Sequence, residues 1–269
     1  MDYIVLFHFH EDIELCRSRI ALLRDFNPGI AIFGLFGGDP DDVAEARTLE
    51  RLGVEHVFHD PKRLPAWNKK NTDLAVANWY RDVGSLVRFN RVHVVQYDLM
   101  FFAPLERVYP KMPNDAVGLT GLIPLQQVAH FWDWIAHEPL AGESKRLLAY
   151  ARQRFDYSGQ PYACIGPGYS LSRAFLDRYS KLQIDDIGHD ELRVPLFAQI
   201  LGVALVDTGF YPRWMDPDIE RVFNADAHEV DPALVKSELG RDGGRRVFHP
   251  CRSRFDRLLV EQLQAAAHR

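Results

Sequence analysis

The sequence predicts a single α/β domain in which helices flank a mostly parallel central sheet. Three features support this prediction: short apolar runs of strand length, amphipathic segments between them, and helix-capping residues at the junctions. The chain has 269 residues, 47% of them hydrophobic, which is enough to bury a substantial core. No linker or low-complexity tract interrupts it, so we expect one domain spanning residues 1–269.

Strands and helices alternate at the start of the chain. An apolar run predicts a strand at residues 3–9, and the apolar side chains after it recur at helical spacing up to an Asn-Pro-Gly turn. A second strand is expected at residues 30–36. Asp39 is placed to cap a helix that ends before Gly53, and a third strand follows at residues 54–58. This βαβαβ order predicts parallel strands joined by right-handed crossovers.

The next strand contains an isolated carboxylate. A helix at residues 71–81 leads to the segment VVQYDLMFFAPL at residues 94–105, in which Asp98 interrupts an apolar run. A buried charge is costly unless something positive or hydrogen-bonding meets it. Asp98 is therefore either paired inside the fold or placed at the strand's carboxyl end, where open α/β sheets bind ligands. Further strands are expected at residues 116–123, 162–171 and 202–208.

Several function classes are disfavoured by composition and motifs. A net charge of −5 and a pI near 6.1 argue against a nucleic-acid partner. The three cysteines, which show neither metal spacing nor a disulfide framework, indicate free thiols and a reducing, cytoplasmic location. The first residues do not resemble a signal peptide, and no apolar stretch is long enough for a transmembrane segment. Neither a Gly-x-Gly-x-x-Gly fingerprint nor a Walker A sequence is present.

Four segments together resemble the GT-A fold glycosyltransferases. The strand at 94–105 is similar to the one that carries the Asp-x-Asp motif of that superfamily. The other three are GPGYSLSRAFL at 166–176, HDELRVPLFAQILG at 189–202 and VFHP at 247–250. The resemblance implies a nucleotide-sugar-binding half at residues 1–105 and an acceptor-side half at residues 106–269. It also implies transfer of a sugar, with inversion, from a nucleotide diphosphate donor such as a UDP-sugar to a hydroxyl of a saccharide or glycolipid. A lipid-linked acceptor would require peripheral contact with a membrane.

The resemblance also implies the donor-side residues. Asp98 and His249 would bind a divalent metal, Mn²⁺ or Mg²⁺, although Leu99 and Met100 follow Asp98, so the second aspartate of Asp-x-Asp is missing. An arginine near the C-terminus could supply part of the positive charge that phosphate requires; the candidates are Arg245, Arg246 and Arg252. The other candidates for contacting the donor are His8, His10, Lys69, Lys70, Asp73 and Asp98 itself. Solvated charges at a helix start would explain the lysines and Asp73 nearly as well.

The acceptor side is implied by acidic and aromatic residues. Glu191 is the expected catalytic base, with Asp190 as the helix cap or the alternative base; both acids would also favour a helix N-terminus without any catalysis. Trp132 and Trp134 are candidates for an acceptor wall, because aromatic faces complement sugar rings, although core packing is the commoner fate of tryptophan. Gly168 is the remaining acceptor candidate.

Two rival functions remain. A nucleotidyltransferase on a related sheet would need a glycine-rich basic loop after the first strand, where residues 8–12 read HFHED instead. A non-catalytic sugar-nucleotide binding module would explain the missing aspartate. Slow, Asp98-dependent release of UDP would favour the transferase over such a module.

Overall fold

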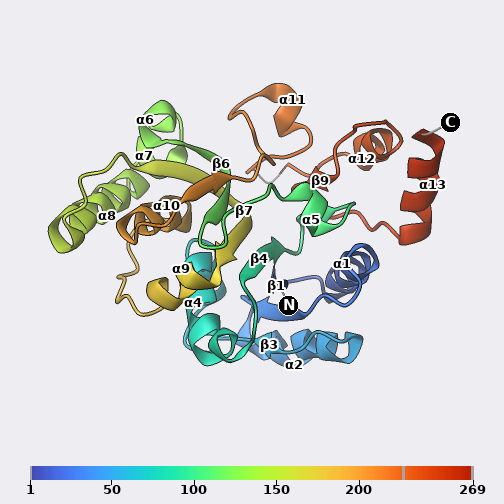
Figure 1. Ribbon diagram of the computed structural model, residues 1–269, viewed down its shortest axis with the longest axis horizontal. Coiled ribbons are helices and arrows are strands. Elements are labelled where there is room, and N and C mark those ends of the chain that lie inside the picture. Colours follow the sequence, from blue (N-terminus) through green and yellow to red (C-terminus); the bar gives the residue numbers. More distant parts are fainter. Residues whose placement is uncertain (1, 226–227, 268–269) are drawn as a thin grey trace.

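A seven-stranded sheet forms the centre of the computed structural model, which describes residues 2–225 and 228–267 (Figure 1). Its strand order is β3-β2-β1-β4-β7-β6-β8, and only β7 runs antiparallel to its neighbours. A second sheet pairs β5 with β9. The predicted α/β class with a mostly parallel sheet is therefore confirmed. The strands are β1 (Tyr3–Phe9), β2 (Ile32–Phe36), β3 (Val57–Phe58), β4 (Arg91–Gln96), β5 (Met100–Phe101), β6 (Val117–Pro124), β7 (Tyr162–Ser172), β8 (Leu205–Asp207) and β9 (Val247–Phe248).

Helices cover both faces of the sheet. The α-helices are α1 (Ile13–Phe26), α2 (Val43–Ala46), α3 (Pro65–Asn68), α4 (Thr72–Asp82), α5 (Leu105–Val108), α6 (Leu125–Val128), α7 (Asp133–Ala136), α8 (Leu140–Phe155), α9 (Arg173–Tyr179), α10 (Asp190–Ile200), α11 (Pro217–Glu220), α12 (Pro232–Leu239) and α13 (Arg257–Ala267). Short 3-10 helices lie at η1 (Pro40–Asp42), η2 (Arg47–Leu52) and η3 (Gly84–Leu86). The helix expected after Asp39 is thus a short α-helix between two 3-10 turns, with Asp39 and Gly53 at its ends as predicted.

Successive side chains of β1 point to opposite faces of the sheet, so this strand contributes to two separate core clusters. Ile4 and Leu6 pack on the side of α4, α8, α9 and α10, whereas Val5, Phe7 and Phe9 pack on the side of α1 and α2. Figure 1 shows these helix groups on opposite sides of the sheet. Both faces are covered, so the strand reads as a continuous apolar run rather than an alternating one. The first core cluster joins strands and helices from both halves of the chain.

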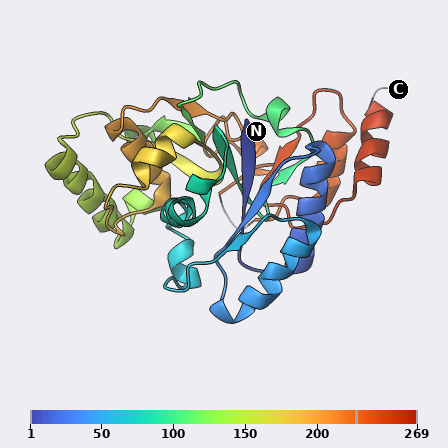
Figure 2. The ribbon, with the colours of Figure 1, turned by 60° about the horizontal axis from the view of Figure 1, so that its bottom comes forward.

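The C-terminal segment packs against α1. A third core cluster joins β5 and β9 to α12 and α13, and Figure 2 shows α13 beside α1. The Arg257 guanidinium donates a 3.1 Å hydrogen bond to the Asp25 carbonyl at the end of α1. The polypeptide therefore returns to the N-terminal half, which brings residues near position 250 to the ends of β1 and β4.

The cysteines and the helices bear on two expectations from the sequence. Cys16, Cys164 and Cys251 are free and buried, as expected. Within residues 2–225 and 228–267, no helix combines the length and hydrophobicity that crossing a bilayer requires.

A buried histidine predicts acid sensitivity of the fold. His93 stacks on Tyr109 with ring centroids 4.1 Å apart, and its Nδ1 atom has no hydrogen-bond partner within the described residues. Burial, with a smaller effect of Arg91, lowers the pKa of His93 to about 3. The unfolded chain binds a proton below its ordinary pKa while the folded chain does not, so stability falls as pH drops below about 6.5.

We expect His93→Phe to remove this effect while keeping the aromatic packing. The free energy of unfolding of the wild type should fall by about 2 kcal/mol more than that of the variant between neutral pH and pH 5. Urea unfolding followed by circular dichroism at a series of pH values measures the difference. Equal pH dependence in the two proteins would show that His93 is protonated in the folded chain.

Candidate functional site

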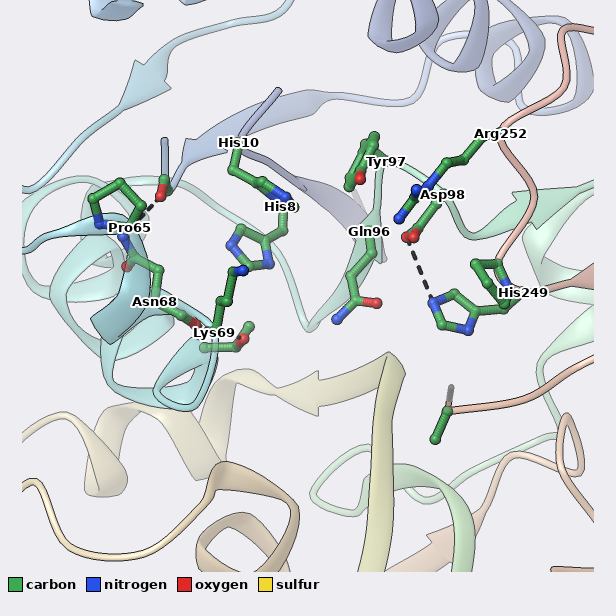
Figure 3. A pocket seen from close by; sticks show the side chains of 14 residues that line it. His8, His10, Pro65, Asn68, Lys69, Gln96, Tyr97, Asp98, His249 and Arg252 are labelled. Atoms are coloured by element: carbon green, nitrogen blue, oxygen red, sulfur yellow. Dashed lines mark hydrogen bonds and ion pairs between the residues drawn. The ribbon is translucent and has the colours of Figure 1, made fainter. Parts of the chain in front are cut away.

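A cavity of about 370 Å³ lies at the carboxyl ends of β1 and β4. This first cavity combines several nitrogen-bearing side chains with one carboxylate, Asp98, as Figure 3 shows. Strand ends of parallel sheets are where α/β folds bind ligands. The labelled lining residues are His8, His10, Pro65, Asn68, Lys69, Gln96, Tyr97, Asp98, His249 and Arg252.

Backbone pairing brings Asp98 and His249 together from distant parts of the sequence. β5 and β9 pair antiparallel, with Met100 opposite Phe248, and the Cys251 amide donates a 2.8 Å hydrogen bond to the Asp98 carbonyl. Arg19 of α1 also donates hydrogen bonds to the carbonyls of Tyr97, Cys251 and Ser253. The buried Arg19 side chain thereby holds the two chain segments side by side.

The Asp98 side chain faces the cavity and not an internal arginine. Its Oδ1 atom lies 3.5 Å from His249 Nε2, and 12% of its side-chain surface is exposed. Burial by itself would raise the pKa of Asp98, but His249 and, to a smaller degree, Arg252 shift it below the ordinary value. Asp98 is therefore ionised at neutral pH, so the first cavity has a fixed negative charge among nitrogen groups.

The His249 ring is oriented by its other nitrogen. Nδ1 lies 2.7 Å from the Asn224 carbonyl, which can only accept, so Nδ1 carries a hydrogen. In the protonated ring the Nε2 hydrogen faces Asp98, and in the neutral ring Nε2 has a lone pair in its place. A metal-binding histidine is usually held in this way, with a carbonyl accepting from the ring nitrogen that does not bind the metal. Within the described residues no three His, Cys, Asp or Glu side chains form a metal cluster, so a cation here would need ligands from the substrate or water.

The two histidines at the end of β1 are neutral at physiological pH. Burial, and next the charge of His10, lowers the pKa of His8 to about 4. Burial likewise lowers the pKa of His10, whose ring lies edge-on to Tyr97 with centroids 4.9 Å apart. Both rings can therefore offer uncharged hydrogen-bonding and stacking surfaces. The cationic side chains of the first cavity are those of Lys69 and Arg252.

A second cavity, of about 500 Å³, adjoins the first. Lys69, Thr72, Gln96, Ala225 and His249 line both cavities, so the two share a boundary. The second cavity is rich in aromatic and acidic side chains. These are Phe131, Trp132, Asp133, Trp134, His189, Asp190, Glu191, Tyr211, Trp214 and Glu220.

Glu191 is held at the wall of the second cavity by two hydrogen bonds. The Gly166 amide donates to Oε1 at 2.7 Å, and the Trp134 indole donates to Oε2 at 2.8 Å. Burial raises the pKa of Glu191 despite the opposing effects of His189 and of these hydrogen bonds, and Asp190 adds to the rise. A carboxylate with a raised pKa in a cleft is suited to proton transfer.

The helix cap differs from the prediction. His189, not Asp190, is the N-cap residue of α10, and Asp190 is the first residue of the helix. The Asp190 Oδ1 atom lies 2.8 Å from His189 Nδ1. Asp190 cannot reach back to the amides of the second and third helical residues from inside the helix, so the role assigned to it falls to its neighbour.

Both candidate tryptophans line the second cavity. Trp132 is 8% exposed and packs edge-on against Trp214, with centroids 5.7 Å apart. Trp134 is partly buried and stacks on His189. Both side chains therefore line the second cavity and also pack against core residues.

Five candidates from the sequence, among them Arg245, line neither cavity. Asp73 is buried in an ion pair with Arg193, at 2.6 Å, so its oxygens are directed away from any donor. Arg246 donates to the carbonyls of Glu238, Gly244 and Arg245 at the turn that precedes β9. Gly168 has φ of +88° and accepts a hydrogen bond at its carbonyl from Tyr109. Lys70 pairs with Glu143 at 3.1 Å rather than lining either cavity.

Gln96 is the main residue that the sequence prediction missed. Met100 stands where the second aspartate of Asp-x-Asp would be, but it is 1% exposed and packs in the third core cluster. Gln96, two residues before Asp98, instead lines both cavities. Within the described part of the chain its amide makes no side-chain hydrogen bond. The signal available in the sequence was that Gln96 is a polar residue two positions before Asp98 in an otherwise apolar run. Arg252 is the arginine that the structure places in the first cavity.

Comparisons with known proteins give only distant similarities. No protein-family model and no curated protein matches the sequence. Among solved structures, mouse xyloside xylosyltransferase 1 is 12% identical, with 76% of this chain and 84% of that chain covered and a TM-score of 0.40. The bifunctional glycosyltransferase WbbM is 11% identical, covering 93% of this chain and 46% of that chain, with a TM-score of 0.44. The galactosyltransferase LgtC, in complex with donor and acceptor sugar analogs, is 12% identical, covering 97% and 83%, with a TM-score of 0.38.

Proposed function

We propose that this chain is a glycosyltransferase that moves a sugar from a nucleotide diphosphate, most simply a UDP-sugar, to a hydroxyl of a saccharide or glycolipid acceptor. Inversion at the transferred carbon is part of the proposal. The observation that carries it is the boundary between the two cavities. Asp98 and His249 lie on the side with the cationic groups, Glu191 lies on the aromatic side, and Gln96 lies between them.

The first cavity suits the donor. Lys69 and Arg252 offer positive charge to a diphosphate, and Arg252 can make bidentate contacts with phosphate oxygens. The neutral His8 and His10 rings, with Asn68, offer stacking and hydrogen bonding to the nucleoside. The volume of about 370 Å³ is in the range of small-molecule sites.

Asp98 and His249 fit a divalent cation, Mn²⁺ or Mg²⁺, whose remaining ligands come from the donor phosphates and water. The fit rests on the orientation of His249: Nδ1 is bonded to the Asn224 carbonyl, so Nε2 is the nitrogen that faces Asp98, and a cation would take the place of the hydrogen between them. A bound cation would neutralise negative charge that develops on the departing diphosphate. Substitution of the second aspartate leaves the protein with few ligands, so we expect binding of the ion to depend on the nucleotide.

The second cavity suits the acceptor. Trp132, Trp134 and Trp214 present aromatic surface to a sugar ring. Glu191 accepts the proton of the attacking hydroxyl as the new bond to the sugar carbon forms and the bond from that carbon to the diphosphate oxygen breaks. The diphosphate leaves with the electron pair of that bond. A base in the second cavity and a leaving group in the first suit inversion, in which attack and departure take place on opposite faces of the sugar carbon.

The rival functions have less support. No glycine-rich loop follows β1, and the N-cap of α1 is Asp12, whose carboxylate would repel a triphosphate at that helix start. A binding module without catalysis would not need the second cavity or a buried carboxylate with a raised pKa beside the first.

Calorimetry with a panel of nucleotide sugars, with and without Mn²⁺, tests the donor class, and assay of free UDP tests turnover. We expect tight binding of one UDP-sugar, strengthened by Mn²⁺, with slow release of UDP that an acceptor accelerates. Tight binding without any turnover over the acceptor panel would favour the binding module. Absence of nucleotide binding would exclude both the glycosyltransferase and the binding module.

Gly166→Ala should block transfer without disturbing the fold. A methyl group at this position would lie 3.5 Å from Glu191 Oε1 and 3.7 Å from Gln96 Nε2, which are ordinary contact distances. It would fill space between the base and the donor-side cavity, so we expect a loss of about tenfold or more in kcat with unchanged donor affinity. Kinetics and donor calorimetry on the same preparation measure both quantities.

Gly240→Ala is the matched control. Gly240 ends α12, and a methyl group there meets no atom nearer than 3.5 Å. Wild-type kcat in Gly166→Ala would mean that no reacting group passes between Gln96 and Glu191.

A further inference from the structure

The start of α10 places two buried acids next to each other. Asp190 is 2% exposed and Glu191 is 7% exposed, and both line the second cavity. Two neighbouring carboxylates with little solvent disfavour each other's ionised form. Within the described residues, His189 is the ion-pair partner of both, with Nδ1 2.8 Å from Asp190 Oδ1 and 3.7 Å from Glu191 Oε2.

The contacts of His189 determine where its hydrogen lies. Nδ1 is 3.3 Å from the Glu191 amide nitrogen and 2.8 Å from the Asp190 carboxylate oxygen. In the neutral ring Nδ1 accepts the Glu191 amide hydrogen as the helix cap, so the ring hydrogen lies on Nε2. A second hydrogen, on Nδ1, would face Asp190 Oδ1, a buried oxygen without a hydrogen-bond donor within the described residues. No hydrogen bond to Nε2 occurs in the part of the chain that the structure describes, and the ring lines the second cavity.

An aromatic face stabilises the same charge. The Trp134 indole stacks on the His189 imidazole with centroids 3.8 Å apart and planes 21° apart. A cation is favoured over the face of an indole ring. The edge of the same indole donates to Glu191. The imidazole, the indole and the two carboxylates therefore form one connected cluster at the cavity wall.

We propose that His189 is a positioning residue that is positively charged at neutral pH and keeps Glu191 ionised and aimed into the second cavity. This inference rests on the proposed function, because it assigns Glu191 as the base. Burial by itself would lower the pKa of His189, but Asp190 and then Glu191 raise it, and the net direction is upward. The other charged groups near the ring are Arg193 of α10, which opposes the rise, Lys70 with its partner Glu143 of α8, and Lys69 across the second cavity.

The charge of His189 can be measured without substrate. Nitrogen–proton correlation spectra of protein with isotope-labelled histidine report the protonation of each ring, and His189→Gln identifies the signal by its absence. We expect both ring nitrogens to be protonated at about pH 7, above the ordinary midpoint near 6.5. A neutral ring at that pH overturns the proposal, whatever the enzyme transfers.

Kinetics test the consequence for Glu191. Removing an opposite charge raises the pKa of a carboxyl group by about one unit or more. His189→Gln should therefore shift the acid limb of the kcat profile to higher pH, with a loss of about tenfold on that limb that disappears at alkaline pH. The KM for the donor should stay the same.

If His189 were only structural, His189→Gln would lower kcat by the same factor at every pH, and that result would overturn the proposal. His137→Gln is the control, because His137 follows the short helix that carries Trp134 and is 71% exposed, and Asp133, at 3.7 Å, is its ion-pair partner among the described residues. If no donor is turned over by the wild type, the proposed function fails, while the spectra still decide the charge of His189.

Discussion

Replacing Asp98 with asparagine is expected to lower the rate of sugar transfer by about 10²–10³-fold, the usual loss when a group that stabilises developing charge is removed. Asparagine keeps the shape of the side chain but not the charge. Asp98 is ionised in the first cavity, and its carboxylate is 3.5 Å from His249 Nε2. Without that carboxylate, the proposed cation loses the only acidic group that lines the first cavity within the described residues, and the diphosphate loses the cation that neutralises it. UDP release and product formation measure the effect.

The loss of transfer in Asp98→Asn supports the donor site only if the variant is folded. Circular dichroism should give a native spectrum, because the Asp98 main chain remains bonded to the Cys251 amide. Asp42→Asn, at an exposed position in η1, is the matched control and should retain wild-type transfer. If folded Asp98→Asn transferred sugar at the wild-type rate, the assignment of the first cavity as the donor site would be wrong.

The second large effect concerns stability. Asp73→Ala is expected to lower the free energy of unfolding by about 3–5 kcal/mol, because it leaves the buried Arg193 guanidinium without its counter-ion. Both Asp73 oxygens accept from Arg193, at 2.6 and 2.7 Å, and Tyr179 donates to the same carboxylate. Burial would lower the pKa of Arg193, but Asp73 outweighs it and raises that pKa. Urea unfolding at neutral pH measures the loss.

The pair also connects the two sides of the proposed site. Asp73 lies at the start of α4, four residues after Lys69, and Arg193 lies in α10, two residues after Glu191. The double variant Asp73→Leu with Arg193→Met should recover most of the lost stability, since apolar replacement of a whole buried pair is often neutral. Asp82→Ala, on the exposed end of the same helix, should change stability little. Equal stability of Asp73→Ala and the wild type would show that solvent reaches Arg193.

Local patterns predicted the elements well. The strand at residues 3–9 and the caps at Asp39 and Gly53 appear where expected, because burial on both faces and cap geometry are encoded by neighbouring residues. The sequence predicted Asp98 at the end of a strand and Glu191 at the start of a helix. Ligands bind at such ends in α/β folds, and the two residues line adjoining cavities.

The contacts between distant residues could not be predicted from such patterns. Asp73 finds Arg193 far along the sequence, and the polar run before α4 gave no sign of that partner. The segment around Asp98 was predicted as one strand, but β4 ends at Gln96 and Met100 begins a strand of another sheet, so the alternation of faces does not continue through Asp98. The His189 cap was missed because the acidic residues that follow it are the commoner caps.

Anomalous diffraction from crystals soaked with UDP and Mn²⁺ tests the central claim most directly. The account predicts nucleotide density in the first cavity and a manganese peak in contact with Asp98 and His249, both lost in Asp98→Asn. Nucleotide bound elsewhere, or a first cavity that stays empty at saturating UDP and Mn²⁺, would contradict it.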